Sequence, residues 1–185
     1  GDSEKLFGEV LRANPSLREK MVIATKGGIV LGVPYDSSGA YLQEAVEKSL
    51  TRMGIETIDL YQIHRPDFLG HPAEIASVLT KLREEGKIRE IGVSNYTPSQ
   101  FSVLQAYLDF PIVTRQPEFS CWKHDPLRNG ILDQCLEYQT TPLAWSPLGG
   151  GTLTWTLEKA QSENQTLANL LTRLDKIASE QGVSR

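Results

Sequence analysis

The stretch IDLYQIH at residues 58–64 decides the fold of this chain, because it predicts a buried β-strand that ends in a polar side chain. Four other apolar and β-branched runs lie at residues 21–26, 88–94, 112–119 and 142–148. The five runs begin roughly 25 to 37 residues apart, which is the length of one strand, one helix and two loops. Amphipathic stretches separate them. The pattern therefore predicts parallel strands that are buried between helices.

The stretches between the strands carry signals for helix starts and helix ends. At the clearest start, Thr97 can cap the first amides, Pro98 suits the first turn, and Gln100 can complete a capping box. Similar starts occur at His71-Pro72 and Asp125-Pro126, and Gly54 and Gly86 stand where helices should end. After Ser37 and Ser38, one apolar helix face is predicted from the spacing of Leu42, Val46, Leu50 and Met53.

Five strands that alternate with helices fit two α/β architectures, an open doubly wound sheet or a barrel of eight units. The open sheet should carry a GxGxxG or GxxxxGK[ST] phosphate loop, and neither motif occurs in this sequence. A parallel (β/α)8 TIM barrel is therefore favoured. Because eight units need about 250 residues, we expect residues 1–185 to form a single incomplete barrel domain of about five units. We also expect this domain to be a portion of a longer polypeptide, since its edge strands would otherwise lack partners.

The composition of the chain argues against several functional classes. A net charge of -4 leaves the lysines and arginines thinly spread, so neither nucleic acid nor a membrane surface is an expected partner. Cys121 and Cys135 lack the spacing of metal ligands, so we expect no metal site and favour a reducing, cytoplasmic setting. No apolar run approaches the roughly 20 residues that cross a bilayer, and no signal-peptide pattern is visible.

Polar side chains gather where the predicted strands end. In a barrel these ends carry the active site, because the loops that follow the strands converge there. The residues at predicted strand ends are Lys26, His64, Ser94, Asn95, Trp145 and Ser146, and Gln116 lies inside the fourth run. The same placement in several units indicates a functional site rather than chance surface composition.

Each of these residues also has a purely structural interpretation. Lys26 could point into solvent, and His64 could be a buried histidine with satisfied hydrogen bonds. Trp145 could belong to the core, and the polar residues near it could form turns or satisfy backbone groups. The glycines at 149–151 could form a flexible turn or could let a phosphate approach the backbone amides.

Three segments of the chain resemble signatures of the aldo-keto reductase superfamily. The longest is MGIETIDLYQIHRPD at residues 53–67, which resembles the central signature of that family. A second resemblance lies in GKIREIGVSN at residues 86–95, and a third in WSPLGGG at residues 145–151. Residues 1–8 look like the segment that follows the catalytic tyrosine of the family. The resemblance covers nearly the whole chain.

The resemblance implies an oxidoreductase that reduces aldehydes or ketones by hydride transfer from NADPH. Lys26 and His64 match two members of a catalytic tetrad, whose tyrosine and aspartate would precede Gly1. In the family the lysine cation lowers the pKa of the tyrosine that donates the proton, and the histidine polarises and orients the carbonyl. This stretch by itself is therefore not expected to turn over substrate.

The resemblance also implies a set of cofactor contacts. Ser94, Asn95 and Gln116 match residues that bind the nicotinamide carboxamide, and Trp145 lies where relatives stack a tyrosine on the nicotinamide ring. Residues near the pyrophosphate would be Ser146, Leu148, Gly149 and Gly150. The segments that bind the 2'-phosphate would follow Arg185. One departure is Arg115, where many relatives have asparagine.

Three hypotheses follow for function. The leading one is an NADPH-dependent reductase of a small-molecule carbonyl substrate, and a second is a non-catalytic NADPH-binding accessory subunit that senses redox state. A third is a Schiff base on Lys26, as in barrel aldolases. The physiological carbonyl and the oligomeric state are not encoded in any motif of this sequence, and the preference for NADPH over NADH rests on the resemblance alone.

Overall fold

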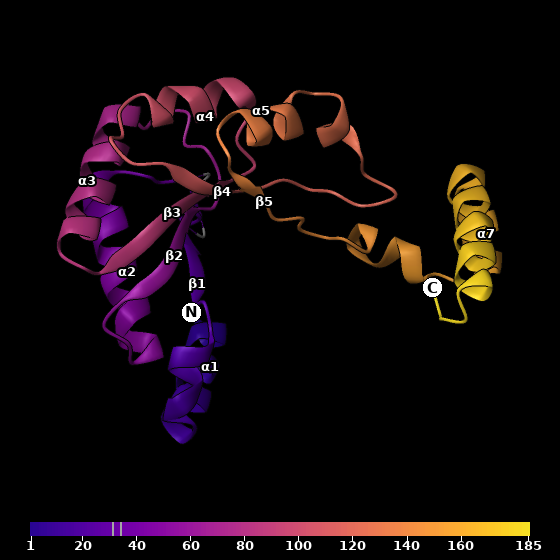
Figure 1. The fold of residues 1–185 in the computed structure, drawn as a ribbon, viewed down its shortest axis with the longest axis horizontal. Helices are drawn as coiled ribbons and strands as arrows, with labels where there is room; N and C mark the ends of the chain where they lie inside the picture. Colours follow the sequence, from indigo (N-terminus) through magenta and orange to yellow (C-terminus); the bar gives the residue numbers. More distant parts are fainter. Residues whose placement is uncertain (31, 34) are drawn as a thin grey trace.

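The computed structural model describes residues 1–30, 32–33 and 35–185. Strands and helices alternate along most of its length (Figure 1). The strands are β1 (Ala24–Gly27), β2 (Ile58–Ile63), β3 (Ile88–Ser94), β4 (Ile112–Gln116) and β5 (Thr141–Pro142). The α-helices are α1 (Asp2–Ala13), α2 (Gly39–Met53), α3 (Pro72–Glu84), α4 (Pro98–Gln105), α5 (Ile131–Glu137), α6 (Leu157–Glu163) and α7 (Gln165–Glu180). Short 3-10 helices span Pro15–Lys20, Asp125–Leu127 and Gly149–Thr154.

All five strands belong to one parallel sheet, and their spatial order is the order of the sequence, β1-β2-β3-β4-β5. Helices α2, α3 and α4 lie together on one face of this sheet (Figure 1). A doubly wound sheet would reverse its strand order and would place helices on both faces. Sequential order with helices on one face is the arrangement of a barrel wall. The chain is therefore an incomplete (β/α)8 fold, as predicted.

The main core fills the layer between the sheet and helices α1 to α4. Every residue of β2 is buried, and Tyr61 and Ile63 belong to this core together with Val93 of β3. The predicted apolar face of α2 is confirmed, since Leu42, Val46 and Met53 are buried and Leu50 packs partly buried against them. The strand pattern that identified the fold therefore coincides with the best-packed part of the molecule.

The predicted helix boundaries are confirmed at four positions. Thr97 and Gln100 form a complete capping box at the start of α4. His71 caps α3, because its Nδ1 accepts a hydrogen bond of 3.2 Å from the amide of Ala73. Gly54 and Gly86 follow α2 and α3 with φ angles of 67° and 72°, in the left-handed region that glycine adopts without strain.

Other predicted boundaries are wrong. Strand β5 spans only Thr141–Pro142, so a single residue of the run at 142–148 is strand. The run at 112–119 is interrupted after Gln116, since Pro117 has no N–H for the ladder, and beyond it only an isolated bridge forms between Glu118 and Trp145. The strand predicted at 21–26 is shifted to Ala24–Gly27. Asp125-Pro126 begins only a 3-10 turn, and α5 starts at Ile131. The Asp125 carboxylate pairs with Lys123 at 3.0 Å.

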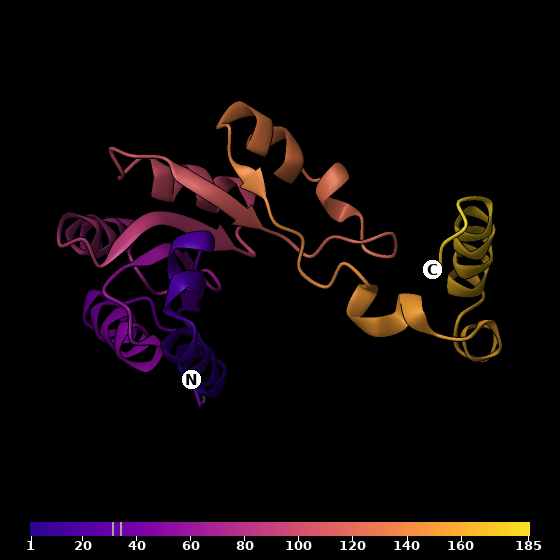
Figure 2. The same cartoon turned by 60° about the horizontal axis from the view of Figure 1, so that its bottom comes forward.

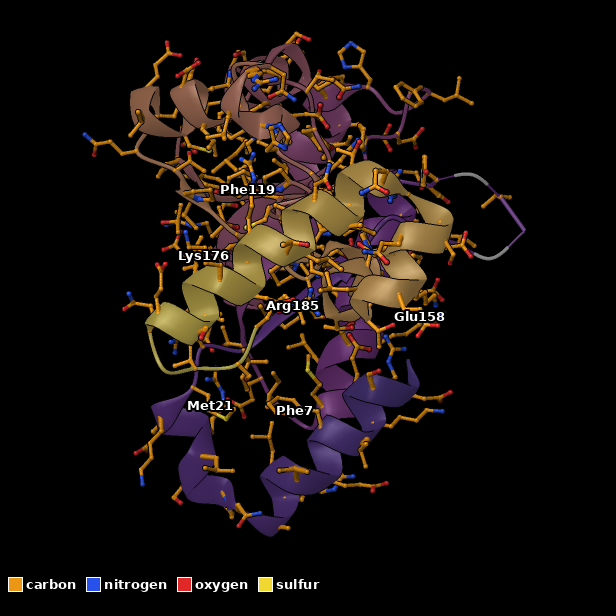
Figure 3. The ribbon with its side chains drawn as sticks, turned by 90° about the vertical axis from the view of Figure 1, so that its right-hand side faces the viewer. Phe7, Met21, Phe119, Glu158, Lys176 and Arg185 are labelled. Atoms are coloured by element: carbon orange, nitrogen blue, oxygen red, sulfur yellow. The ribbon has the colours of Figure 1, made fainter. Side chains whose placement is uncertain are left out.

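The segment after β5 lies apart from the sheet. Figures 1 and 2 show α7 at the far end of the molecule from α2 and α3. It has a small core of its own, in which Leu153, Ala160, Leu167, Ala168 and Leu171 are buried. Arg185, labelled in Figure 3, folds back onto this segment through Asp175 at 3.2 Å and the carbonyl of Trp155 at 2.8 Å. No helix among the described residues is long and apolar enough to cross a membrane.

Candidate active site

The carboxyl ends of the strands enclose a cavity of about 250 Å³. It is lined by Lys26, His64, Arg65, Ser94, Asn95, Gln116 and Trp145. Strand register explains this gathering, because Lys26 of β1 is paired with Gln62 of β2, and Ser94 of β3 with Gln116 of β4. Side chains two residues apart on a strand share a face, so Gln62 and His64 project to the same side. Six residues predicted from the sequence therefore meet in one place.

Lys26 and His64 line the same cavity and influence each other. Burial lowers the pKa of Lys26 from its ordinary value. Burial also lowers the pKa of His64, and the positive charges of Lys26 and Arg65 lower it further. Among the described residues, none with a carboxylate lines this cavity. His64 is therefore held neutral near pH 7, with one ring nitrogen able to donate and the other able to accept.

Both residues also touch a second, larger cavity. It has a volume of about 880 Å³ and runs beside β1 and α1. Glu4 lies in its wall, where it accepts hydrogen bonds from Thr25 at 2.6 Å and from Arg52 at 2.6 Å. Lys26 and His64 therefore line both cavities.

Asn95 is the most highly connected residue of the site. Its side-chain nitrogen donates to the carbonyl of His64 at 3.2 Å and to Oγ of Ser94 at 3.0 Å. Its side-chain oxygen accepts from the indole N–H of Trp145 at 3.0 Å. The residue has a φ of 61°, which is uncommon outside glycine and is often found at functional sites. Asn95 thus joins segments from three different units of the barrel.

Ser94 and Gln116 close the other side of the cavity. Oγ of Ser94 donates to the carbonyl of Gln116 at 3.0 Å, and the amide of Asn95 donates to the same carbonyl at 3.1 Å. The Gln116 side chain, in contrast, makes no hydrogen bond to any residue that the structure describes. Its amide group is therefore available to a ligand.

Four predicted cofactor residues lie outside this cavity. Ser146, Leu148, Gly149 and Gly150 belong to the turn and 3-10 helix after β5, and Leu148 is 56% exposed. Ser146 has a φ of 49°, and the two glycines also have positive φ. The structure does not bring these residues together with Lys26 and His64. Their predicted contact with the pyrophosphate stays a prediction.

Two residues in and beside the site were not predicted from the sequence. Arg65 lines the cavity directly after His64. Asp67 fastens two loops, because its carboxylate accepts from the amide of Ser37 at 2.9 Å and from the amide of Leu69 at 2.9 Å. Their proximity to His64 in the RPD stretch was the available signal. Contacts between loops do not recur at a regular spacing in the sequence, so no periodic pattern predicts them.

Arg115 supports the site from behind the sheet. It is only 1% exposed, and its guanidinium donates to the carbonyl of Tyr96 at 2.7 Å and to the side-chain oxygen of Gln134. It also lies 5.4 Å from the ring centre of Phe101. Gln134 in turn donates to Ser102 and to the carbonyl of Pro98 on α4. Arg115 therefore ties the turn that follows Asn95 to the helix layer.

Comparison with known proteins identifies the family. The model of the aldo/keto reductase family matches residues 1–185. The chain belongs to the aldo/keto reductase family. It is 48% identical over its full length to 6-dehydroglucose reductase of Novosphingobium aromaticivorans and covers 59% of that protein. It is also 37% identical to 6-dehydroglucose reductase of Agrobacterium fabrum, with 98% of this chain and 61% of the relative aligned.

A solved structure agrees with this assignment. The structure of the glycerol dehydrogenase AKR11B4 from Gluconobacter oxydans superimposes with a TM-score of 0.85 at 30% identity. The superposition covers 98% of this chain and 61% of that one. The aldo/keto reductase chain described here thus spans about three fifths of the length of these three relatives. The (β/α)8 prediction is confirmed by the fold of this relative.

Proposed function

We propose that this chain carries part of the active site of an NADPH-dependent reductase of aldehydes or ketones. The observation that carries the proposal is that Lys26, His64 and Gln116 line one cavity at the carboxyl ends of three different strands. Relatives of the chain are named as reductases, and the family consists of oxidoreductases. The prediction of an NADPH requirement rests on the resemblance in the sequence.

The residues present fit a nicotinamide group. Gln116 offers an amide without a partner among the described residues, and amides recognise amides through paired donors and acceptors. Trp145 offers an indole face in the same cavity, and aromatic rings favour offset stacking. The bound cofactor would supply the hydride. The turn at Ser146 to Gly150 would hold its phosphates through backbone amides.

The roles of Lys26 and His64 follow from the charge that the reaction develops. When a carbonyl carbon is reduced, its oxygen gains negative charge and must be protonated. A neutral His64 donates a hydrogen bond to that oxygen and so orients the carbonyl. The Lys26 cation favours the ionised form of a neighbouring phenol and so lowers its pKa. We place that tyrosine and its partner aspartate before Gly1, in line with the sequence resemblance.

The names of two relatives suggest which substrate to assay first. Both are 6-dehydroglucose reductases, at 48% and 37% identity. We therefore propose a polyhydroxylated aldehyde as the small-molecule substrate. The free Cys121 and Cys135 suit a reducing compartment, which supports a cytoplasmic location.

The test follows NADPH absorbance with the full-length protein and 6-dehydroglucose, with simple aromatic aldehydes as a second set. Turnover with NADPH, with weaker use of NADH, is the expected result. Absence of both nucleotide binding and turnover would overturn the proposal. Tight NADPH binding without turnover, together with a stable protein partner, would instead favour the accessory-subunit hypothesis. Trapping of substrate on Lys26 by borohydride would favour the Schiff base.

A further inference from the structure

Arg65 is a charged residue of the active-site cavity that the proposed mechanism does not use. It lines the cavity together with Lys26 and His64. Among the described residues its guanidinium pairs with no carboxylate, and no residue that lines the cavity is acidic. The carboxylate of Asp67, two residues later, is already engaged by two backbone amides. The N–H donors of Arg65 therefore lie at the cavity without an anionic partner in the described part of the chain.

The backbone on either side of Arg65 is held in place. The amide of His64 donates to the carbonyl of Gly27 at 2.8 Å, and the carbonyl of His64 accepts from the side chain of Asn95 at 3.2 Å. Pro66 follows directly, and a residue before proline strongly favours an extended backbone. The long side chain of Arg65 therefore starts from a fixed point, which lowers the entropy cost of binding a ligand.

The cavity has an excess of positive charge. Burial lowers the pKa of His64, and the charges of Lys26 and Arg65 lower it further, so both cations act on this imidazole. In the proposed mechanism the charge of Lys26 serves the tyrosine that donates the proton. The charge of Arg65 has no such use. A ligand that brings a negative group to the cavity would gain Coulomb energy, because charges near a protein surface are screened less than in bulk water.

The cofactor does not supply this negative group in the arrangement proposed above. Its phosphates would lie at the turn from Ser146 to Gly150, and no residue of that turn lines the cavity of Arg65. The nicotinamide ring carries no negative charge. The remaining occupant is the carbonyl substrate, whose oxygen accepts from His64 in the proposed mechanism.

We propose that Arg65 is a specificity-determining residue, which pairs with a carboxylate or phosphate group of the carbonyl substrate. This inference rests on the proposed function and narrows its substrate class to aldehydes or ketones with an anionic group close to the carbonyl. The short separation follows from the chain, since His64 and Arg65 are consecutive residues of one cavity wall. The planar fork of a guanidinium matches the oxygens of either group, and such charge-assisted bonds are stronger than neutral ones.

The experiment uses two matched pairs of substrates with the full-length protein and NADPH. Glyceraldehyde 3-phosphate is compared with glyceraldehyde, and succinic semialdehyde with its methyl ester, so each pair differs in one anionic group. The ratio of kcat/KM within each pair is measured for the wild type, for Arg65→Met, which removes the charge, and for Arg65→Lys, which keeps the charge without the fork. Arg173→Met, at an exposed position of α7, is the matched control.

The wild type should favour the anionic member of at least one pair about tenfold, as expected for a charge-assisted hydrogen bond. The pair that shows the preference identifies the group as phosphate or carboxylate. The preference should fall to about onefold in Arg65→Met, take an intermediate value in Arg65→Lys and persist in Arg173→Met. Equal preference in the wild type and Arg65→Met would overturn the inference. A wild type without preference in either pair would overturn it before any variant is made.

Cofactor binding separates this inference from the proposed function. The affinity for NADPH, measured by quenching of tryptophan fluorescence, should change less than about twofold in Arg65→Met. A loss of about tenfold would overturn the inference, because Arg65 would then hold the cofactor rather than the substrate. Turnover of the neutral substrates alone would overturn the inference and leave the reductase proposal intact. Absence of both NADPH binding and turnover would remove the proposed function as well.

Discussion

The barrel wall from β1 to β4 and the segment that follows β5 place their polar residues in different ways. In the wall, paired strands of four to seven residues carry Lys26, Ser94 and Gln116 to one cavity. After β5, which has two residues, the turn at Ser146 to Gly150 is held by its own local hydrogen bonds. Register along a ladder therefore positions side chains from distant parts of the sequence. A turn without a ladder is positioned mainly by its neighbours in the chain.

The largest expected effect is a loss of catalytic rate when a residue of the barrel wall is changed. Lys26→Met in the full-length protein should lower kcat/KM for carbonyl reduction about 10³-fold, because it removes the charge that tunes the proton donor. NADPH absorbance measures the rate. Lys20→Met, at an exposed position outside the cavity, is the matched control and should change the rate less than twofold. Equal loss in the two variants would contradict the role of Lys26.

The next largest effect concerns the stability of the barrel wall at the end away from the cavity, where Asp59 lies near the start of β2. Asp59 is 8% exposed and accepts from Arg18 at 2.8 Å, from Arg89 at 2.9 Å and from the amide of Ile23 at 2.8 Å. Asp59→Asn should lower the free energy of unfolding by about 3 kcal/mol, because it leaves two arginines without their shared partner. Urea unfolding measures it, with Asp109→Asn as an exposed control.

The same carboxylate has a predictable pH dependence. Burial acts to raise the pKa of Asp59, but the bonds from Arg18 and Ile23 and the charges of Arg18 and Arg89 outweigh it and lower the pKa. Its contribution to stability is therefore present above the ordinary pKa of 3.8 and is lost as the pH falls through the lower, folded value. The wild type should lose more stability than Asp59→Asn over that acidic interval. Equal losses would show that the arginines do not hold this charge.

Alanine substitutions at two glycines allow the stability of the wall and of the final segment to be compared directly. A Cβ on Gly92 would lie 2.0 Å from Oγ1 of Thr114, whereas one on Gly150 would meet no atom within 4 Å. Gly92→Ala should therefore cost about 3 kcal/mol through overpacking. Gly150→Ala should cost about 1 kcal/mol, from its φ of 64° alone. Thermal unfolding of both variants tests this order, and a larger loss for Gly150→Ala would reverse it.

The smallest effect concerns the titration of His64. Burial, Lys26 and Arg65 lower its pKa below the ordinary value of 6.5. The folded state therefore binds its proton less readily than the unfolded state, and stability is lost as the pH falls from 6.5 through the folded pKa. In the wild type this loss of unfolding free energy should be less than about 1 kcal/mol, and in His64→Gln it should be absent. Urea midpoints measured between pH 7 and pH 5 check it, and identical slopes in both proteins would contradict it.

Sequence patterns predicted the wall well because burial on both faces of a strand leaves a continuous apolar run. The run at 88–94 matches β3 residue for residue. Most of the polar residues predicted at strand ends line the cavity, among them Lys26 and His64, but Ser146 does not. The prediction was wrong where proline interrupts the ladder, as at Pro117 and within 142–148. Apolar composition persists there, but beyond Pro117 the backbone pairs only as an isolated bridge between Glu118 and Trp145.

The remaining features depend on contacts that no local pattern encodes. The Asn95–Trp145 bond joins residues 50 positions apart, and Asp67 reaches the amide of Ser37 across 30 positions. Arg115 was visible only as a departure from the family, and its burial between sheet and helices depends on Gln134. Side-chain hydrogen bonds of this kind are decided by the assembled fold.

The two hydrogen bonds of Asp67 have different reach. The bond from the amide of Leu69 stays within the loop that joins β2 to α3, whereas the bond from the amide of Ser37 ties that loop to the chain that precedes α2. One carboxylate therefore shapes its own turn and also fixes a second segment 30 positions away. Replacing Asp67 with asparagine would weaken the attachment between two loops that follow different strands, with the strands themselves left unchanged.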